Sequence, residues 1–338
     1  MLRGREGDFV ELDDGSIFEV KGLSHPSYGV IAYPRYIPDE KGERARGGRR
    51  YHKLHTLLEK EEFIKSRFPE YYTFDPYYQR MLPIIPWSRV RKHYTPQYAV
   101  TELLAAHNLA GLRLKALQFV RYVADIANIP LEKLGISGSI MLGLEGEDSD
   151  IDLVVYGLKE TQKVKAAILK AMAEGKIIRR LTEKHLKDLY LSRSKDTQMS
   201  YKDFLKVEER KSNQGLFDDK LFFIRYLKDW NEVDEMYGEY RIRRLGYARI
   251  AAEVLEASQA HLTPATYLLK DVRVLLGPSW LTVDRLITWR GRFAEQACEG
   301  EAVIAQGYVE EYLHKGGVLR QMVVGEGRED TILPTLNS

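Results

Sequence analysis

The chain has 338 residues, of which 44% are hydrophobic and 30% are charged, and this composition excludes intrinsic disorder as its main state. The length corresponds to two or three domains. The 51 lysine and arginine residues are balanced by 49 aspartate and glutamate residues, so the net charge of +2 gives no argument for nucleic-acid binding from bulk charge.

The first segment, residues 1–55, is predicted to be β-rich. Alternating apolar residues in 9–12 and 17–20 flank an Asp-Gly turn, which is typical of a hairpin, and 30–33 adds a third strand. The run 41–50 (KGERARGGRR) has five basic residues, three glycines and no apolar periodicity, which predicts a flexible exposed loop. Two roles stay open for this loop, a solvated turn or a contact with phosphate.

Residues 56–100 are predicted to form a helical and aromatic/basic connector. A helix is expected in the first half, and residues 71–94 interleave aromatic with basic side chains. Such side chains can stack on a nucleic acid and neutralise it. The flanking prolines favour instead that these aromatic residues pack at a domain junction.

Residues 101–235 have the element order of an α/β unit. Apolar residues at helical spacing predict one amphipathic helix over 102–127 and another over 161–174 that ends at a glycine. Apolar strands are expected from residue 150 and over 220–228.

Residues 236–338 are predicted to form a small β-barrel, because short β-rich runs alternate with turn residues. Its arginines and aromatics suit a single-strand nucleic-acid binder and a docking module equally well. The predicted fold class is therefore α+β multidomain, with a mixed α/β core flanked by an N-terminal β segment with helices and a C-terminal small β-barrel.

Cysteine content and hydropathy bear on the location of the protein. The single cysteine, Cys298, excludes an intramolecular disulfide and a cysteine-rich zinc site, and it agrees with a reducing cytoplasm. No apolar run reaches the roughly 18 residues of a membrane helix, and the N-terminus lacks the apolar core of a signal peptide. We therefore expect a cytoplasmic protein that does not associate with a membrane.

Residues 135–157 (GISGSIMLGLEGEDSDIDLVVYG) carry the most informative motif. A Gly138-Ser139 turn precedes an apolar strand that begins around Asp150 and Asp152. Side chains alternate in a strand, so both carboxylates project from one face about 6 to 7 Å apart and can share hard divalent cations. Gly138 lets the backbone approach a polyphosphate, and Ser139 offers a hydroxyl and an N–H to its oxygens.

This motif resembles the signature of the polymerase-β-like nucleotidyltransferase superfamily, in which Gly-Ser and a gap precede Asp-x-Asp flanked by apolar residues. The longer form, Gly-Ser-x-x-x-Gly followed by Ser-Asp-Ile-Asp-Leu, is most similar to the minimal nucleotidyltransferases. The resemblance implies a nucleotidyltransferase-type core over residues 101–235. It also implies catalytic, metal-binding roles for Asp150 and Asp152 with Mg²⁺ or Mn²⁺, and nucleotide binding by Gly138 and Ser139.

Two departures from the family pattern bear on activity. Active members carry a basic residue in the Gly-Ser loop where this chain has Leu142, so a local cation for phosphate is missing. They also carry a third carboxylate on a later strand, where this chain has Phe223. Asp219, just before that strand, is our prediction for the third metal ligand. The alternative is a site in which only the two aspartates bind the metal.

Two hypotheses follow. The first is a metal-dependent enzyme that transfers a nucleoside monophosphate from an NTP to a hydroxyl acceptor and releases pyrophosphate. Because large β modules flank the core, the acceptor is expected to be a macromolecule, RNA before protein. The second is a degenerate nucleotidyltransferase fold that acts as an RNA-binding or scaffolding protein. The sequence leaves the preferred NTP and the oligomeric state open.

Overall fold

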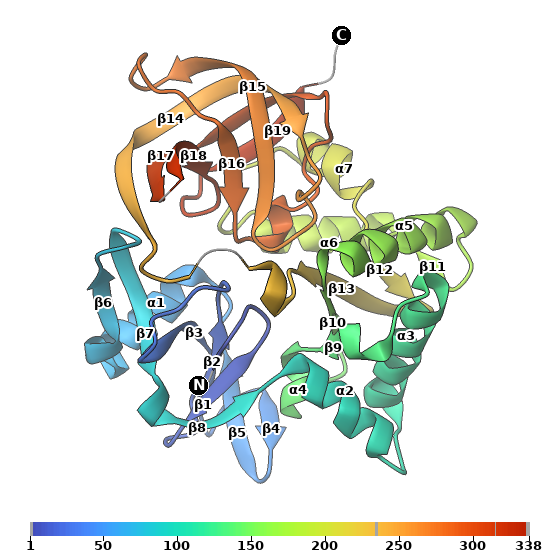
Figure 1. Ribbon diagram of the computed structural model, residues 1–338. Coiled ribbons are helices and arrows are strands. Elements are labelled where there is room, and N and C mark those ends of the chain that lie inside the picture. The colour runs from blue at the N-terminus through green and yellow to red at the C-terminus, as the bar shows by residue number, and fades with distance from the viewer. Residues whose placement is uncertain (1–2, 234–235, 315, 336–338) are drawn as a thin grey trace. The chain divides into compact units, whose positions relative to one another are not determined.

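The structure is a computed structural model that describes residues 3–233, 236–314 and 316–335. Within these residues it has seven α-helices and three β-sheets, so the chain is a mixed α+β protein as predicted (Figure 1). It divides into two compact units. Unit 1 comprises Met1–Asp75, Arg80–Arg179 and Gln214–Tyr237, and unit 2 comprises Pro76–Gln79, Arg180–Asn213 and Gly238–Ser338.

An antiparallel eight-stranded sheet forms the N-terminal part of unit 1. Its main path runs β4-β5-β3-β2-β1-β8, and β7 joins β3 to β6. The expected hairpin is confirmed, with Phe9 opposite Glu19. Three strands lie in the stretch that the sequence assigned to a connector. The elements are β1 (Phe9–Leu12), β2 (Ile17–Val20), β3 (Gly29–Pro38), α1 (Leu57–Arg67), β6 (Tyr72–Asp75), β7 (Arg80–Pro86) and β8 (Val90–Tyr94).

The core of this sheet is covered by α1. The helix begins with a capping box, in which Thr56 and Glu59 each accept a hydrogen bond from the other's backbone N–H. Its buried Ile64 packs with Phe18, Val30 and other apolar side chains of the strands. Burying each large apolar side chain stabilises the fold by about 1.5 to 3 kcal/mol. This burial holds the helix on the sheet.

The basic run 41–50 is not a flexible loop, so that expectation is wrong. β4 (Arg44–Arg46) and β5 (Arg49–Lys53) form an antiparallel hairpin, and β5 also pairs with β3. The turn residues Gly47 and Gly48 have positive φ angles of 56° and 77°, which a tight two-residue turn requires. The hairpin depends on pairing with β3 rather than on an apolar pattern of its own, so the local sequence does not reveal it.

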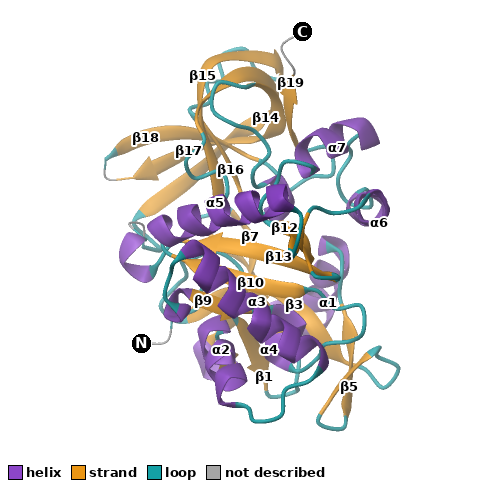
Figure 2. Ribbon diagram, turned by 90° about the vertical axis from the view of Figure 1, so that its right-hand side faces the viewer, coloured by secondary structure: helices purple, strands orange, loops and turns teal. Residues whose placement is uncertain are grey.

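The motif lies in a five-stranded sheet of unit 1 with the order β11-β12-β13-β10-β9. β10 and β13 are parallel, and the other pairs are antiparallel. Helices α3 and α5 pack together and cover one face of the sheet (Figure 2). The elements are β9 (Leu134–Ile136), α4 (Gly138–Leu142), β10 (Ile151–Tyr156), α5 (Leu158–Glu174), β11 (Ile178–Arg179), β12 (Gln214–Phe217) and β13 (Lys220–Leu227).

The helix expected over 102–127 is two helices, α2 (Pro96–Ala105) and α3 (Gly111–Ala127). Gly111 has a φ of 56°, a left-handed conformation that is incompatible with a continuous α-helix. The helix expected over 161–174 is confirmed as α5, and Gly175 ends it with a φ of 65°.

Unit 2 contains a β-rich body, as predicted for the C-terminal residues. The pairings of β14, β15, β16, β18 and β17 return to β14 and so close a ring, and β19 pairs with β17. The elements are α6 (Glu183–Arg193), α7 (Tyr201–Glu208), β14 (Tyr240–Glu256), β15 (Ala265–Leu276), β16 (Arg285–Thr288), β17 (Ala302–His314), β18 (Gly317–Val323) and β19 (Thr331–Thr335).

Over the described ranges, none of the helices combines enough length with enough apolar character to cross a bilayer.

Candidate active site

Asp150 and Asp152 lie at the start of β10, which pairs with β13 on one side and β9 on the other in the five-stranded sheet. Asp150 directly precedes β10, and Asp152 is its second residue. Both side chains are half-buried. Alternation places Ile151 toward the helices, whereas Asp152 shares the opposite face with Val154, whose side chain lies near Gly7. The N-terminal segment of unit 1 therefore covers the face of β10 that carries Asp152.

Gly138 lies directly against Asp152. The N–H of Ser137 donates to the Asp152 carbonyl oxygen at 2.9 Å, which joins the end of β9 to β10. Gly138 has a φ of 64°, and a Cβ at this position would overlap Oδ2 of Asp152. Glycine is thus required both by backbone conformation and by space. Ser139 follows in α4 and is buried.

Phe223 lies beside Asp152 in the parallel ladder of β10 and β13. Opposed residues of neighbouring strands point to the same face of a sheet. The benzyl side chain of Phe223 therefore occupies the place next to Asp152 where the family pattern has a third carboxylate.

Asp219 lies in the turn between β12 and β13. Its Oδ1 is 2.9 Å from Nη2 of Arg179, and its side chain is 93% exposed. Across the described ranges, no three His, Cys, Asp or Glu side chains are grouped so that they could hold a metal ion. The structure brings Gly138 into contact with Asp152, and it does not add Asp219 to the group.

The pKa of Asp152 is raised to about 7. Burial is the largest cause and the charge of Asp150 is the second, while Arg225 and Lys53 act in the opposite direction. Repulsion between the two carboxylates is the condition that a shared divalent cation relieves, because its charge favours the ionised form of both. Two such oxygen donors fit a hard cation such as Mg²⁺.

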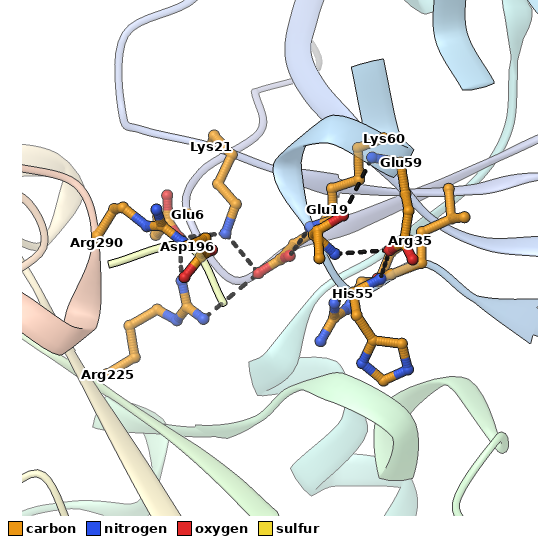
Figure 3. A network of polar contacts seen from close by, with 12 residues as sticks. Glu6, Glu19, Lys21, Arg35, His55, Glu59, Lys60, Asp196, Arg225 and Arg290 are labelled. Carbon is orange, nitrogen blue, oxygen red and sulfur yellow. Dashed lines mark hydrogen bonds and ion pairs between the residues drawn. The ribbon is translucent and has the colours of Figure 1, made fainter. Parts of the chain in front are cut away.

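A network of ion pairs anchors the N-terminal segment to β13 near this face (Figure 3). Glu19 on β2 contacts Nζ of Lys21 at 2.6 Å and Nη2 of Arg225 at 3.5 Å. Glu6 contacts Arg225 and, at 3.2 Å, Lys21. Arg225 is two residues after Phe223 and therefore on the same face as Asp152. The network fixes the N-terminal sheet over the site.

Three basic residues near the aspartates were not identified as site residues from the sequence. Arg35 belongs to β3, Arg44 to β4 and Lys53 to β5. Asp150 and Asp152 both raise the pKa of Lys53, although burial is the largest influence and lowers it. Of the three, only Arg44 lies in the basic run 41–50, for which a contact with phosphate had been left open.

The comparisons with known proteins agree with this geometry. Residues 118–214 match the model of the nucleotidyltransferase domain. A protein of Methanocaldococcus jannaschii described as uncharacterized is 28% identical over 337 residues, which are 97% of this chain and 97% of that protein. No solved structure matches the chain. The matched segment includes Gly138, Asp150 and Asp152, so residues 118–214 are similar to the nucleotidyltransferase domain, as the resemblance to the polymerase-β-like superfamily predicted.

Proposed function

We propose that the protein transfers a nucleoside monophosphate from an NTP to a hydroxyl acceptor and releases pyrophosphate. The observation that carries this proposal is the contact between Gly138 and Asp152. It joins a turn whose backbone can approach phosphate to a carboxylate that can bind the phosphate's cation. Asp150 and Asp152 would hold Mg²⁺ or Mn²⁺, and Gly138 and Ser139 would hold the nucleotide.

The proposed reaction needs a divalent cation and the residues that would hold it. When bound, the divalent cation supplies positive charge that stabilises the leaving pyrophosphate and orients the attacking hydroxyl. Asp150 and Asp152 would hold that cation at the start of β10. Asp219 is left out of the proposed metal site because its carboxylate pairs with Arg179.

We further propose that the acceptor is a macromolecule, RNA before protein. The domain match covers residues 118–214, and the chain adds an eight-stranded sheet and a six-stranded sheet outside it. The similarity to the protein of Methanocaldococcus jannaschii extends across 97% of both chains. Such additions exceed what recognition of a small acceptor requires.

A second candidate is a degenerate domain that binds RNA or acts as a scaffold. Phe223 beside Asp152 favours it, because β13 then supplies no carboxylate at that position. Leu142 favours it as well, since the Gly-Ser turn carries no cation of its own.

Label transfer distinguishes the two candidates. Each α-labelled NTP is incubated with Mg²⁺ or Mn²⁺, total small RNA and protein, using the wild type and the double variant Asp150→Asn, Asp152→Asn. Incorporation that requires both aspartates supports the transferase and identifies the base and the acceptor class. Absence of label with retained RNA binding would favour the scaffold.

Asp219→Asn is expected to retain the transfer rate within about twofold. Its carboxylate is highly exposed and pairs with Arg179, and exposed ion pairs contribute about 0 to 1 kcal/mol. The rate of label incorporation at saturating NTP measures this. A loss as large as that of Asp150→Asn would instead make Asp219 the third ligand.

Gly138→Ala is expected to lower the transfer rate about a hundredfold, because the added Cβ displaces the Asp152 carboxylate. Gly175→Ala is the matched control. Gly175 has a similar φ of 65°, but a Cβ there meets nothing within 4 Å. Both substitutions cost about 1 to 2 kcal/mol of backbone strain, measured by chemical unfolding. Equal transfer rates for the two variants would contradict the proposed role of the contact.

A further inference from the structure

Three half-buried cations belong to strands of the N-terminal sheet, and we infer that Arg35, Arg44 and Lys53 bind the triphosphate of the nucleotide. This inference rests on the proposed function and adds phosphate-binding residues to it. It also gives the N-terminal sheet a role in nucleotide binding.

Backbone pairing and a hydrogen bond place Lys53 and Arg35 close to each other at the end of β5. Lys53 is the last residue of β5 and lies opposite Tyr36 of β3. Nη1 of Arg35 donates to the carbonyl oxygen of Leu54 at 2.6 Å, so its guanidinium lies beside the end of β5.

Arg44 reaches across to the motif itself. Its Nη1 donates to Oγ of Ser149 at 3.2 Å, and Ser149 directly precedes Asp150. A Cβ on Gly146 would overlap the same Nη1. The guanidinium of Arg44 is thus seated on the segment that leads into the first aspartate.

Electrostatic interactions link the cations to the carboxylates. The pKa of Lys53 is lowered, first by burial and then by Arg35, while Asp150 and Asp152 oppose this and Arg44 adds to it. Lys53 therefore lies within electrostatic reach of both aspartates and of the other two cations.

Among the residues that the structure describes, no carboxylate forms an ion pair with the side-chain nitrogens of Arg35, Arg44 or Lys53, although the Glu43 carboxylate accepts from the backbone N–H of Lys53 at 2.9 Å. Nε of Arg44 is buried without a hydrogen-bond partner. Arg46 on the same strand differs, because it contacts Glu11 at 2.7 Å and the carbonyl oxygen of Leu142 at 3.0 Å. Arg46 has a structural role, whereas Arg35, Arg44 and Lys53 keep donors for a ligand.

A triphosphate is the ligand that fits this arrangement. A half-buried cation without a counterion is unfavourable, and phosphate oxygens offer charge-assisted hydrogen bonds to guanidinium and ammonium groups. The aspartates on the facing strand would hold the cation that bridges the same phosphates. The three basic residues therefore supply the positive charge for phosphate that is missing from the Gly-Ser turn, where the chain has Leu142.

Binding of inorganic tripolyphosphate and of each NTP, with Mg²⁺ present, tests the inference by calorimetry. Arg44→Ala and Lys53→Ala are each expected to weaken binding about tenfold or more. Lys53→Arg should retain most of the affinity because it keeps the charge. Arg49→Ala is the matched control, since Arg49 lies in the same hairpin, is exposed, and donates to the carbonyl oxygen of Asp14.

The outcomes separate the inference from the proposed function. Unchanged affinity in Arg44→Ala and Lys53→Ala, or no binding by the wild type, would overturn the inference even if the wild type transfers label. Weakened binding in these variants but not in Arg49→Ala supports it even if no label is transferred. Lys53→Gln removes the charge while keeping most of the side-chain stem, and thermal unfolding of each variant separates lost binding from lost folding.

Discussion

Asp152→Asn is expected to lower the rate of nucleotidyl transfer at least about a thousandfold while making the protein more stable at pH 8. The loss of rate follows from removal of a proposed metal ligand, since about 4 kcal/mol of transition-state stabilisation corresponds to three powers of ten. The gain in stability follows from the environment of this carboxylate, whose charge is disfavoured by burial and by Asp150.

The pH dependence of that gain has a defined sign. The native Asp152 holds its proton up to about pH 7, whereas an ordinary aspartate releases it near 3.8. The native state binds more protons than the unfolded state between these values, so wild-type stability falls as pH rises from about 4 to about 7. Asparagine cannot ionise, and Asp152→Asn is therefore free of this loss.

The measurement is chemical unfolding in EDTA at pH 4.5 and at pH 8. We expect the variant to exceed the wild type by roughly 2 to 4 kcal/mol at pH 8 and by only about 1 kcal/mol or less at pH 4.5. Asp148→Asn, at an exposed position in the same segment, should change neither stability nor transfer. A variant that is less stable than the wild type at pH 8 would contradict this account of Asp152.

The local part of the candidate site could be predicted from the sequence. Gly138 and Asp152 are only 14 positions apart in the chain and are joined by a short antiparallel pairing of β9 with β10. Their spacing and residue types alone indicate the chemistry. Pairing between distant strands is different, because Arg44 and Ser149 are separated by 105 positions and meet only in the folded chain.

The position of the expected third metal ligand also depends on pairing between strands, which the sequence does not reveal. Asp219 lies close to β13 in sequence, and the parallel register of β10 and β13 determines which residue stands beside Asp152. That register places Phe223 there. A two-residue turn directs Asp219 to Arg179 instead. No pattern in a single strand contains this information, because register is a property of the pair.

In the fold as well, features set by the local sequence were predicted, whereas features set by contacts between separate segments or by backbone conformation were missed. The helix α5 with its glycine stop, and the β-rich character of the C-terminal residues, arise from local periodicity and were predicted correctly. The hairpin of β4 and β5 was missed because it is stabilised by β3 rather than by apolar alternation of its own. The break between α2 and α3 was missed because apolar spacing continues across a glycine of positive φ.

Glu19→Gln is expected to lower the free energy of unfolding by about 3 to 5 kcal/mol at pH 7. Glu19 is buried, and its carboxylate is the common partner of Lys21, Lys60 and Arg225. Glutamine fills the same space but leaves these cations without that charge. Urea unfolding measures the effect, with Glu61→Gln as control, because Glu61 has an exposed partner on α1 and its loss should cost about 0.5 kcal/mol or less.

Acid should reduce the difference between Glu19→Gln and the wild type. Burial raises the pKa of Glu19, but Lys21, Lys60, Arg225 and Arg35 outweigh it and hold that pKa well below the ordinary 4.5. The stabilisation is therefore complete above about pH 4.5 and is lost as pH falls toward the native pKa. A difference that stays constant from pH 7 to pH 3 would show that Glu19 acts through its shape rather than its charge. In that case the ion pairs would not be what holds the N-terminal sheet over Asp152.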